Sequence, residues 1–340
     1  MRRHYFTSLL TLGAVMLLAG SSSAQQFNYA AIDVPCSVAP PTSCPNGMAL
    51  QTVASGINPA GDIVGFFADG VGGQHGFLLR AGHFTTIDFP GAVATSANGI
   101  APSGDIVGNY LAPYIPGVSN AVPANSLAYC PAAGSAACIK GFLYSRGKYS
   151  TVLFPGHPGA VPQRISPDGD IYGCLHDFDL MTSMFGAAWK RFGNASLTVN
   201  GGELADGSMS MPMSMNNGAT PGGHVIVGFW NDMATGARHG FIVRDGQFQS
   251  YDVPNSTLTA AWDINPSQQF VGTYVAAGHR HGFLQNPDGS GPVQLDFHDA
   301  AGNVASATVA FGINPDGAIV GQYSMSGHIH GFVAVPATSN

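Results

Sequence analysis

Two pairs of histidines near the C-terminus are the residues of this chain with the clearest capacity for chemistry. One pair is His279 and His281 in the stretch HRHGF, and the other is His328 and His330 in HIHGF. Residues two apart in an extended strand lie on the same face, so each pair can present two imidazoles to one ion. Imidazole suits zinc and copper. The pattern therefore predicts a Zn or Cu site at these four histidines, and the alternative is that they are structural.

The second histidine of each pair belongs to a short segment that recurs along the chain. The segment is His-Gly-Phe in its commonest form, and its copies begin at His75, Lys140, Phe185, His239, His281 and His330. A histidine held at one repeat position favours a structural role, such as a hydrogen bond between strands. The same argument applies to four recurring aspartates, which are Asp33, Asp88, Asp252 and Asp296.

Four methionines alternate in the stretch SMSMPMSM, at Met209, Met211, Met213 and Met215. Alternate residues of an extended strand point to one side, and thioethers are soft ligands that suit Cu(I). The stretch is thus a candidate copper site. The alternative is that Met215 fills a core position while the other three belong to a connector, because Met is a common gap-filler in cores.

A second recurring motif, Gly-Ile-Asn-Pro-x-Gly-x-Ile-Val-Gly, indicates the elements that position these side chains. Its anchor residues are Ile57, Ile100, Ile165, Met215, Ile264 and Ile313, with spacings mostly in the forties, the range of propeller blades. Asn-Pro-Asp-Gly at Asn314–Gly317 suits a type I turn followed by a glycine with positive φ, so each copy predicts a hairpin. A glycine in the second strand, such as Gly65, indicates close approach of another backbone, as between stacked sheets.

The His-Gly-Phe segment supplies a third strand, and a motif ending in Asp-x-Pro supplies a fourth. The sixth copy has no fourth strand, whereas the stretch FNYAAIDVP at Phe27–Pro35 is a fourth strand with no repeat before it. Pairing of this stretch with the sixth copy would close the ring and hide its sheet edges. The sequence therefore predicts an all-β, six-bladed β-propeller of four-stranded blades over residues 25–340, closed by its N-terminal strand.

The Gly-Ile-Asn-Pro-x-Gly and His-Gly-Phe motifs together resemble the HAF-type extracellular repeat family of bacterial secreted proteins. That family is named for a His-Ala-Phe core, and here the middle residue is Gly in most copies. The resemblance covers about Phe27 to Pro336, and the unit from Gln163 to Asp206 departs most from the pattern. It implies a secreted repeat protein and no catalytic residues.

The first 24 residues predict an export signal. MRRHY supplies the positive start, LLTLGAVMLLAG the apolar segment and Ser22–Ala24 the small-residue cleavage site. The apolar run is too short to span a bilayer. The expected mature protein is soluble and monomeric, without a membrane span, and is exported to the periplasm or the medium by the Sec or the twin-arginine route.

Cysteine usage agrees with an oxidising compartment. Cys36 and Cys44 enclose SVAPPTS, and Cys130 and Cys138 enclose PAAGSAA. This repeated spacing in loop-like sequence predicts two local disulfides, Cys36–Cys44 and Cys130–Cys138. Cys174 is left over inside a predicted strand and is expected to be a buried, inert thiol.

Composition limits the possible partners. The net charge is -7, only 12 residues are Lys or Arg, and no basic cluster follows the leader. A phosphate-backbone partner needs many such residues, so nucleic acid is not expected.

The sequence contains no G-x-S-x-G elbow and no phosphate-binding glycine loop. Its long insertions, including Leu111 to Ile139 and His176 to Met184, are expected at one end of the ring, and elaborated loops commonly carry function. The predicted function is ligand or partner binding at that end without catalysis, with an extracellular polysaccharide as one candidate ligand. The alternatives are a metal-assisted enzyme that degrades an extracellular polymer and a periplasmic metal-binding protein.

Overall fold

The computed structural model describes residues 26–337 apart from short gaps. The gaps are 36–37, 39–46, 120, 122–129, 131, 134, 136–137, 154–156, 177–183, 191–192, 196–208, 216–224, 233 and 245–246. All named elements of the described residues are β-strands, so the predicted all-β class is confirmed. In the same residues no helix has the length and apolar character needed to cross a membrane.

The strands follow one another as antiparallel runs of four, here called units and numbered in chain order. Unit 1 is β2 (Gln51–Ile57), β3 (Ile63–Ala68), β4 (Gln74–Arg80) and β5 (His83–Ile87). Unit 2 is β6 (Ala94–Ile100), β7 (Ile106–Leu111), β8 (Ile139–Ser145) and β9 (Lys148–Val152). Unit 3 is β10 (Gly159–Ile165), β11 (Ile171–His176), β12 (Met184–Lys190) and β13 (Gly193–Ala195).

Units 4 to 6 repeat the arrangement. Unit 4 is β14 (Met209–Met215), β15 (Val225–Asn231), β16 (Arg238–Arg244) and β17 (Gln247–Tyr251). Unit 5 is β18 (Leu258–Ile264), β19 (Phe270–Ala276), β20 (His279–Gln285) and β21 (Val293–Leu295). Unit 6 is β22 (Ala307–Ile313), β23 (Ile319–Met325), β24 (His328–Pro336) and, as its fourth strand, β1 (Phe27–Ile32).

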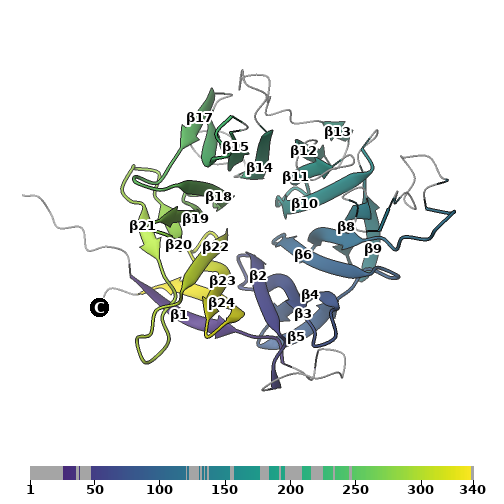
Figure 1. The fold of residues 1–340 in the computed structure, drawn as a ribbon, viewed down its shortest axis with the longest axis horizontal. Helices are drawn as coiled ribbons and strands as arrows, with labels where there is room; N and C mark the ends of the chain where they lie inside the picture. Colours follow the sequence, from purple (N-terminus) through teal and green to yellow (C-terminus); the bar gives the residue numbers. More distant parts are fainter. Residues whose placement is uncertain are drawn as a thin grey trace, which may run out of the picture.

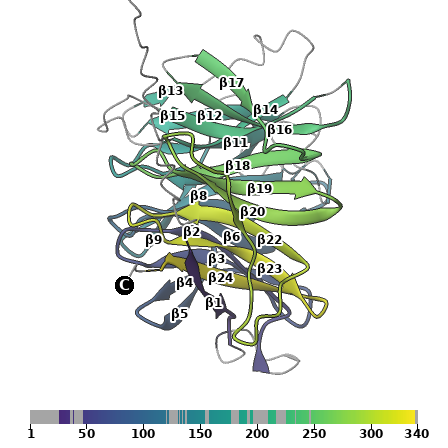
Figure 2. The same cartoon turned by 90° about the vertical axis from the view of Figure 1, so that its left-hand side faces the viewer.

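The N-terminal strand completes the last unit. β1 pairs antiparallel with β24 from Phe27 opposite Pro336 to Ile32 opposite Gly331. In Figure 1 and in the side view of Figure 2, β1 in purple lies against the yellow strands of unit 6. The orphan fourth-strand motif therefore takes the place that the sixth copy leaves open.

Consecutive units lie side by side around a common centre (Figure 1). Each first strand contacts the first strands of both neighbouring units, and β22 contacts β2. Four pairs of neighbouring units are each connected by a single parallel bridge. The bridges join Arg238 with Leu258 (units 4 and 5), Arg280 with Ala307 (units 5 and 6), Ile329 with Gln51 (units 6 and 1), and Gln74 with Ala94 (units 1 and 2). The first and last units thus touch in the same way as units that are neighbours in sequence.

The predicted hairpin turns are present between the first two strands of each fully described unit. In unit 1 the Asn58 side-chain oxygen accepts the N–H of Asp62 at 2.9 Å, and Gly61 has a φ of 80°. The Asn314 side chain donates to the main-chain oxygen of Asn58 at 3.3 Å and links unit 6 to unit 1. These turns close one end of the molecule, here called the turn end.

The glycines Gly65, Gly108, Gly173, Gly272 and Gly321 of the second strands make room for atoms of their own units and not for a neighbouring sheet. A Cβ added to Gly65 would lie 1.9 Å from the main-chain oxygen of Val53 and 2.8 Å from the ring of Phe77. The Phe of the recurring segment is fully buried in five units, at Phe77, Phe142, Phe241, Phe283 and Phe332. The predicted close approach of another backbone is present, because a main-chain oxygen of the first strand is the nearest atom, but its expected origin in stacked sheets was wrong, because that oxygen and the ring of the third strand belong to the same unit.

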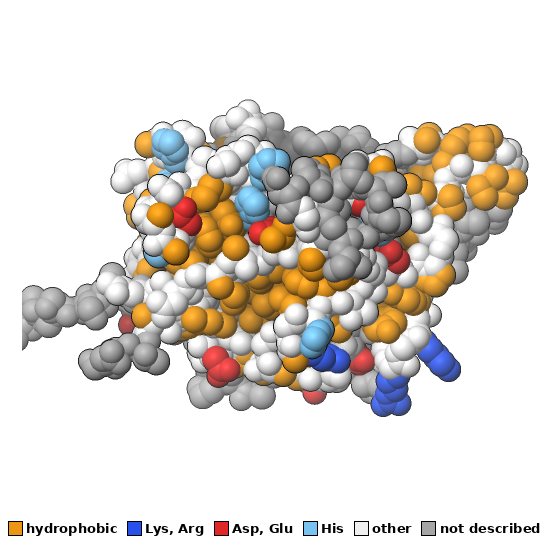
Figure 3. Space-filling model, turned by 90° about the horizontal axis from the view of Figure 1, so that it is seen from below, with side chains coloured by type: hydrophobic (Ala, Val, Ile, Leu, Met, Phe, Trp, Pro, Cys, Tyr) orange, Lys and Arg blue, Asp and Glu red, His pale blue; other side chains and the backbone are white. Residues whose placement is uncertain are grey.

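The opposite end, here called the loop end, holds the connections from second to third strand and those between units. Figure 3 views the molecule from the side of β1 and β5. Histidines gather mainly on one side of a hydrophobic band, and the Lys and Arg side chains lie on the other. In β4, β16, β20 and β24 the recurring histidine is the second or third residue, near the loop end, and β4 and β16 end at the turn end with Arg80 and Arg244.

Candidate functional site

The recurring histidines and aspartates are partners in four units. Nδ1 of the histidine lies 2.7–2.8 Å from a carboxylate oxygen of the aspartate in the pairs His75–Asp88, His239–Asp252, His281–Asp296 and His330–Asp33. Each pair ties the start of a third strand to the residue that follows the fourth strand. The expected inter-strand hydrogen bond is therefore present, and its acceptor is the recurring aspartate. The recurring histidines and aspartates are thus two halves of one hydrogen-bonded pair.

Each of these histidines also packs on an aromatic ring of the second strand. The ring centroids are 4.7–5.2 Å apart in the pairs Phe67–His75, Trp230–His239, Tyr274–His281 and Tyr323–His330. At two boundaries the residue after the aspartate stacks on the aromatic of the following unit, with Phe89 3.7 Å from Tyr110 and Phe297 3.6 Å from Tyr323. A layer of rings thus connects neighbouring units beneath the loop end.

The connector that carries each aspartate is held from the other side by a threonine. A threonine hydroxyl accepts the main-chain N–H of the residue after the aspartate in the pairs Thr52–Val34, Thr95–Phe89, Thr259–Val253 and Thr308–Phe297, at 3.0–3.1 Å. The residue before each of the four histidines also makes one of the parallel bridges. The His–Asp pairs therefore lie where neighbouring units meet.

The His–Asp pairs are partly open to solvent. The histidine side chains are 19–29% exposed and the aspartates 19–42%. Among the described residues, Nε2 of His239, His281 and His330 has no hydrogen-bond partner, whereas Nε2 of His75 lies 3.4 Å from Asp69. Because Nδ1–H donates to the carboxylate, the free Nε2 of a neutral imidazole and the carboxylate oxygens can accept hydrogen bonds from a polar ligand.

Among the described residues, Asp69 is a further carboxylate in contact with one of these pairs, through Nε2 of His75. Its burial raises its pKa, but the N–H groups of Val71 and Gly73 and the ring of His75 act in the opposite direction. The net result is a lowered pKa, so Asp69 remains an anion held by its own loop. In unit 1 the imidazole therefore lies between two carboxylates.

The doubled histidines share a strand, as predicted. The ring centroids of His279 and His281 are 6.4 Å apart, and those of His328 and His330 are 6.3 Å apart. His281 and His330 use Nδ1 on aspartates, while His279 and His328 are exposed. Across the part of the chain that the structure describes, no group of three or more His, Cys, Asp or Glu residues is arranged to hold a metal. Zn or Cu binding stays a prediction.

The methionine stretch forms β14, but its alternation is interrupted. Pro212 pairs with Gly228 and Ser214 with Val227, so a β-bulge lies between them at Met213, which is buried. The bulge shifts the register by one residue and so interrupts the regular alternation on which the copper hypothesis depends, and Cu(I) binding stays a prediction. Met215 pairs with Ile226 as Ile57 pairs with Ile63, so it does occupy the anchor position.

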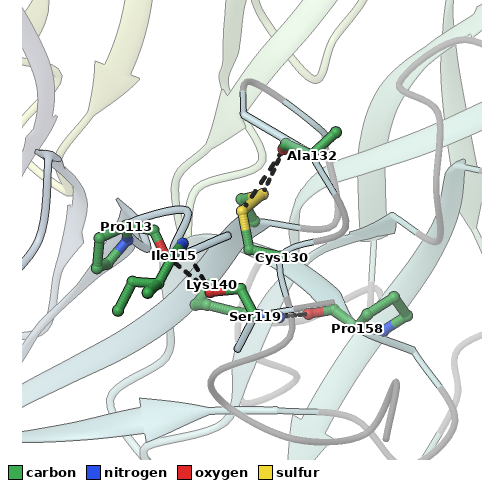
Figure 4. The surroundings of a disulfide bond; sticks show 8 residues. Pro113, Ile115, Ser119, Cys130, Ala132, Lys140 and Pro158 are labelled. Atoms are coloured by element: carbon green, nitrogen blue, oxygen red, sulfur yellow. Dashed lines mark hydrogen bonds between the residues drawn. A yellow bond between two sulfur atoms is a disulfide. The ribbon is translucent and has the colours of Figure 1, made fainter. Parts of the chain in front are cut away.

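Unit 2 replaces the histidine by Lys140, which is fully buried. Its Nζ donates to the main-chain oxygen of Pro158 at 2.5 Å (Figure 4). Burial lowers the pKa of Lys140 to about 8. Leu153 takes the place of the aspartate in this unit. A cation without a carboxylate therefore stands where the other units have a His–Asp pair.

The insertion between β7 and β8 contains the predicted disulfide Cys130–Cys138. The N–H of Cys130 donates to the main-chain oxygen of Ser119, and the N–H of Ala112 donates to that of Cys138 (Figure 4 shows the surroundings). Cys36 and Cys44 lie outside the described residues. Cys174 is buried as predicted, and burial raises its thiol pKa to about 12, which makes it unreactive.

An ion pair at the centre of the molecule was not anticipated from the sequence. The Arg164 guanidinium, on β10, donates to the main-chain oxygens of Asn98 at 2.9 Å, Gln163 at 2.7 Å, Ser55 at 3.1 Å and Phe311. These oxygens belong to residues at the β-bulges of the first strands of units 2, 3, 1 and 6. The guanidinium thus satisfies carbonyls that the strand ladders leave unpaired.

Asp263 of β18 is the counter-ion of Arg164, with Nε 3.1 Å from Oδ2. Asp263 also accepts the hydroxyl of Ser214 at 2.6 Å and the N–H of Ile313 at 3.0 Å. Together Arg164 and Asp263, here called the axial lock, reach the first strand of every unit. Their side chains are only 13% and 10% exposed.

A signal for the axial lock was present in the repeat. The residue before the anchor is glycine in three copies, Gly56, Gly99 and Gly312, and is Arg164, Ser214 and Asp263 in the others. A Cβ added to Gly99 would lie 2.6 Å from the main-chain oxygen of Gln163. Three copies therefore lack side chains at the axis, and this leaves room for the long side chain of Arg164.

No protein-family model and no curated protein matches this chain. Solved structures that resemble it include the SapL1 lectin in complex with alpha methyl fucoside, with a TM-score of 0.47, 9% identity and coverage of 81% of this chain and 89% of that one. A Trypanosoma rangeli sialidase in complex with sialic acid has a TM-score of 0.45 and 9% identity, over 90% of this chain and 58% of that one.

An Aleuria aurantia lectin mutant in complex with Fucalpha1-6GlcNAc has a TM-score of 0.39 and 11% identity, over 86% of this chain and 97% of that one. At these TM-scores and identities the likenesses say nothing about what this chain binds.

Proposed function

We propose that the chain is a six-bladed β-propeller, closed by β1, that binds an extracellular polysaccharide at its loop end without catalysis. Six runs of four strands, the pairing of β1 with β24 and the contact of β22 with β2 support the closed ring. The Cys130–Cys138 disulfide is compatible with an oxidising compartment. Export by a signal in residues 1–24, a monomeric state and membership of the HAF-type family belong to the same proposal.

One observation carries the choice of face: the four His–Asp pairs are partly exposed at the loop end and retain free hydrogen-bonding atoms. The turn end differs, because its Asn side chains bind their own turns and the neighbouring ones. Sugar hydroxyls donate hydrogen bonds, and both the carboxylate oxygens and the Nε2 of a neutral imidazole accept them. Binding is therefore assigned to the loop end.

Paired variants on one strand test the choice of face. His239 is the second residue of β16, at the loop end, and the exposed Arg244 ends this strand at the turn end. We expect His239→Gln to weaken binding of the purified protein to soluble polysaccharides several-fold and Arg244→Gln to leave it unchanged. Loss of binding in Arg244→Gln alone would contradict the assignment.

A second candidate function is metal binding, alone or for an enzyme that degrades an extracellular polymer. The exposed His279 and His328, each on one strand with a second histidine, favour it. Elemental analysis of untagged protein should find near-stoichiometric Zn or Cu that is lost in His279→Ala and His328→Ala. Metal-free protein would remove this candidate.

A further inference from the structure

The four His–Asp pairs occupy consecutive units. They belong to units 4, 5, 6 and 1, and the parallel bridges join unit 4 to 5, 5 to 6 and 6 to 1. Each pair with its aromatic ring is here called a station. The stations contain Trp230, His239 and Asp252; Tyr274, His281 and Asp296; Tyr323, His330 and Asp33; and Phe67, His75 and Asp88. Units 2 and 3, which lack stations, lie outside this arc.

The stations are equivalent because the strand register is the same in each. The aromatic residue lies opposite the histidine in the pairings Phe67–His75, Trp230–His239, Tyr274–His281 and Tyr323–His330. Each histidine follows the residue that bridges to the next unit. The arc therefore presents one polar site repeatedly, at intervals set by the width of a unit.

Three large exposed apolar side chains lie on connections between the stations. Among the described residues, the large exposed hydrophobics are Met48, Leu50, Val71, Val93, Ile115, Val118, Val304 and Val335. All except Val335 are on loop-end connections. Val304 precedes unit 6, and Met48 and Leu50 precede unit 1, so they fall between stations of the arc. Isolated exposed apolar residues are ordinary, but their gathering at one end of a molecule indicates an interaction surface.

The charge of the arc disfavours a polyanion. Its stations carry four carboxylates against two arginines that precede station histidines, Arg238 and Arg280. Arg238 lies over the ring of Phe229 and donates to the side-chain oxygen of Asn231, so its guanidinium is partly used within the protein and is less available to bind an anionic ligand. The buried Lys140 belongs to unit 2, outside the arc. With a net charge of -7 for the chain, an uncharged ligand fits better than an anionic one.

We propose that this arc binds a linear, neutral polysaccharide through several stations at once, an inference that rests on the loop-end function proposed above. Sugar hydroxyls donate to the aspartate oxygens and to the free Nε2 of the imidazole, while the C–H faces of the sugar rings lie on the apolar residues between stations. A polymer with repeating units matches repeated sites, because each further station engaged binds at high effective concentration.

The test uses full-length mature protein with laminarin, mannan, dextran and hydroxyethylcellulose, followed by the di- to octasaccharides of whichever polymer binds. We expect affinity to rise at least tenfold from disaccharide to octasaccharide, and further for the polymer. A disaccharide that binds as tightly as the polymer would overturn the arc but leave the loop-end function intact. Binding of none of the four polymers would overturn the ligand class.

Two variants keep the test independent of folding. Val304→Ser changes a side chain that is 63% exposed, and we expect it to lower polymer affinity several-fold at unchanged thermal stability. Val335→Ser, at the turn end and 43% exposed, is the matched control and should have no effect. Equal polymer affinity in both variants would contradict the arc, and preferential binding of polygalacturonate would replace the neutral ligand by an anionic one.

Discussion

The loop end and the axis both pair an aspartate with a basic side chain, but they do so in different ways. The His–Asp pair occurs in four units and leaves its atoms partly exposed, whereas the Arg164–Asp263 lock occurs once and is buried. Each His–Asp pair ties one unit together and borders one neighbour, while the lock reaches all the first strands. Repeated contacts build the units, and a single asymmetric contact joins them at the centre.

The sharpest way to break this comparison is to remove the lock. We expect Arg164→Ala to lower the free energy of unfolding by about 3–5 kcal/mol, because Asp263 is left buried without its counter-ion. Chemical denaturation monitored by fluorescence measures this. The double variant Arg164→Met with Asp263→Leu should recover part of the loss. A cost below about 1 kcal/mol for Arg164→Ala would show that the axis does not depend on this pair.

The second prediction concerns unit 2, in which the buried Lys140 replaces the histidine of the His–Asp pair. The pKa of Lys140 is about 8 in the folded protein, whereas an unperturbed lysine, as in the unfolded chain, has a pKa of 10.5. Between these two pH values the unfolded chain therefore holds a proton on Lys140 that the folded chain does not. The free energy of unfolding must therefore rise with pH across this window, by about 3 kcal/mol in total.

The variant Lys140→Met should remove this rise and stabilise the protein at pH 7. Denaturant midpoints measured from pH 7 to 10 for both proteins isolate the Lys140 contribution, since all other titrating groups are shared. Parallel curves for the two proteins would contradict the buried, destabilising lysine.

The disulfide gives a smaller expected effect. Replacing Cys130 and Cys138 by Ala should lower the free energy of unfolding by about 2–3 kcal/mol, because the unfolded chain is no longer cross-linked. The effect is modest because the loop that the disulfide closes is short. Thermal unfolding with and without reductant provides the comparison. An unchanged midpoint in reductant, with reduction confirmed by mass spectrometry, would contradict a stabilising bond.

The smallest effect belongs to a single His–Asp pair. We expect His239→Ala to cost about 1 kcal/mol, the usual contribution of one partly exposed hydrogen bond, because three equivalent pairs remain. Asp252→Ala should cost about the same, and the double variant little more, if the two act only on each other. Strictly additive losses would show that they are not coupled.

Much of the fold follows from local chemistry in the sequence. The Asn-Pro-x-Gly stretches predict the hairpins, and the orphan stretch at Phe27 predicts a partner for the last unit, which β24 provides. The bulge in β14 was not predictable, because a register shift depends on the partner strand and not on the alternation of Met209 to Met215.

The candidate site was less predictable than the fold. His75 and Asp88 were each recognised as recurring, but their partnership was not, since a whole strand lies between them. Arg164 and Asp263 are further apart still, and only the ring arrangement brings them together. The repeat position before the anchor residue is glycine in three copies but Arg164, Ser214 and Asp263 in the others, and this difference can be seen in the sequence. Its meaning can be recognised only when it is known that the first strands converge on one axis.

Amide hydrogen exchange with and without the bound polysaccharide tests the central claim, that the loop end is the binding face. The account predicts slower exchange in the loop-end connections, at residues 88–93, 252–257 and 296–306, and unchanged exchange in the turns at residues 58–62 and 314–318. Protection confined to those turns, with the loop-end connections unaffected, would contradict it.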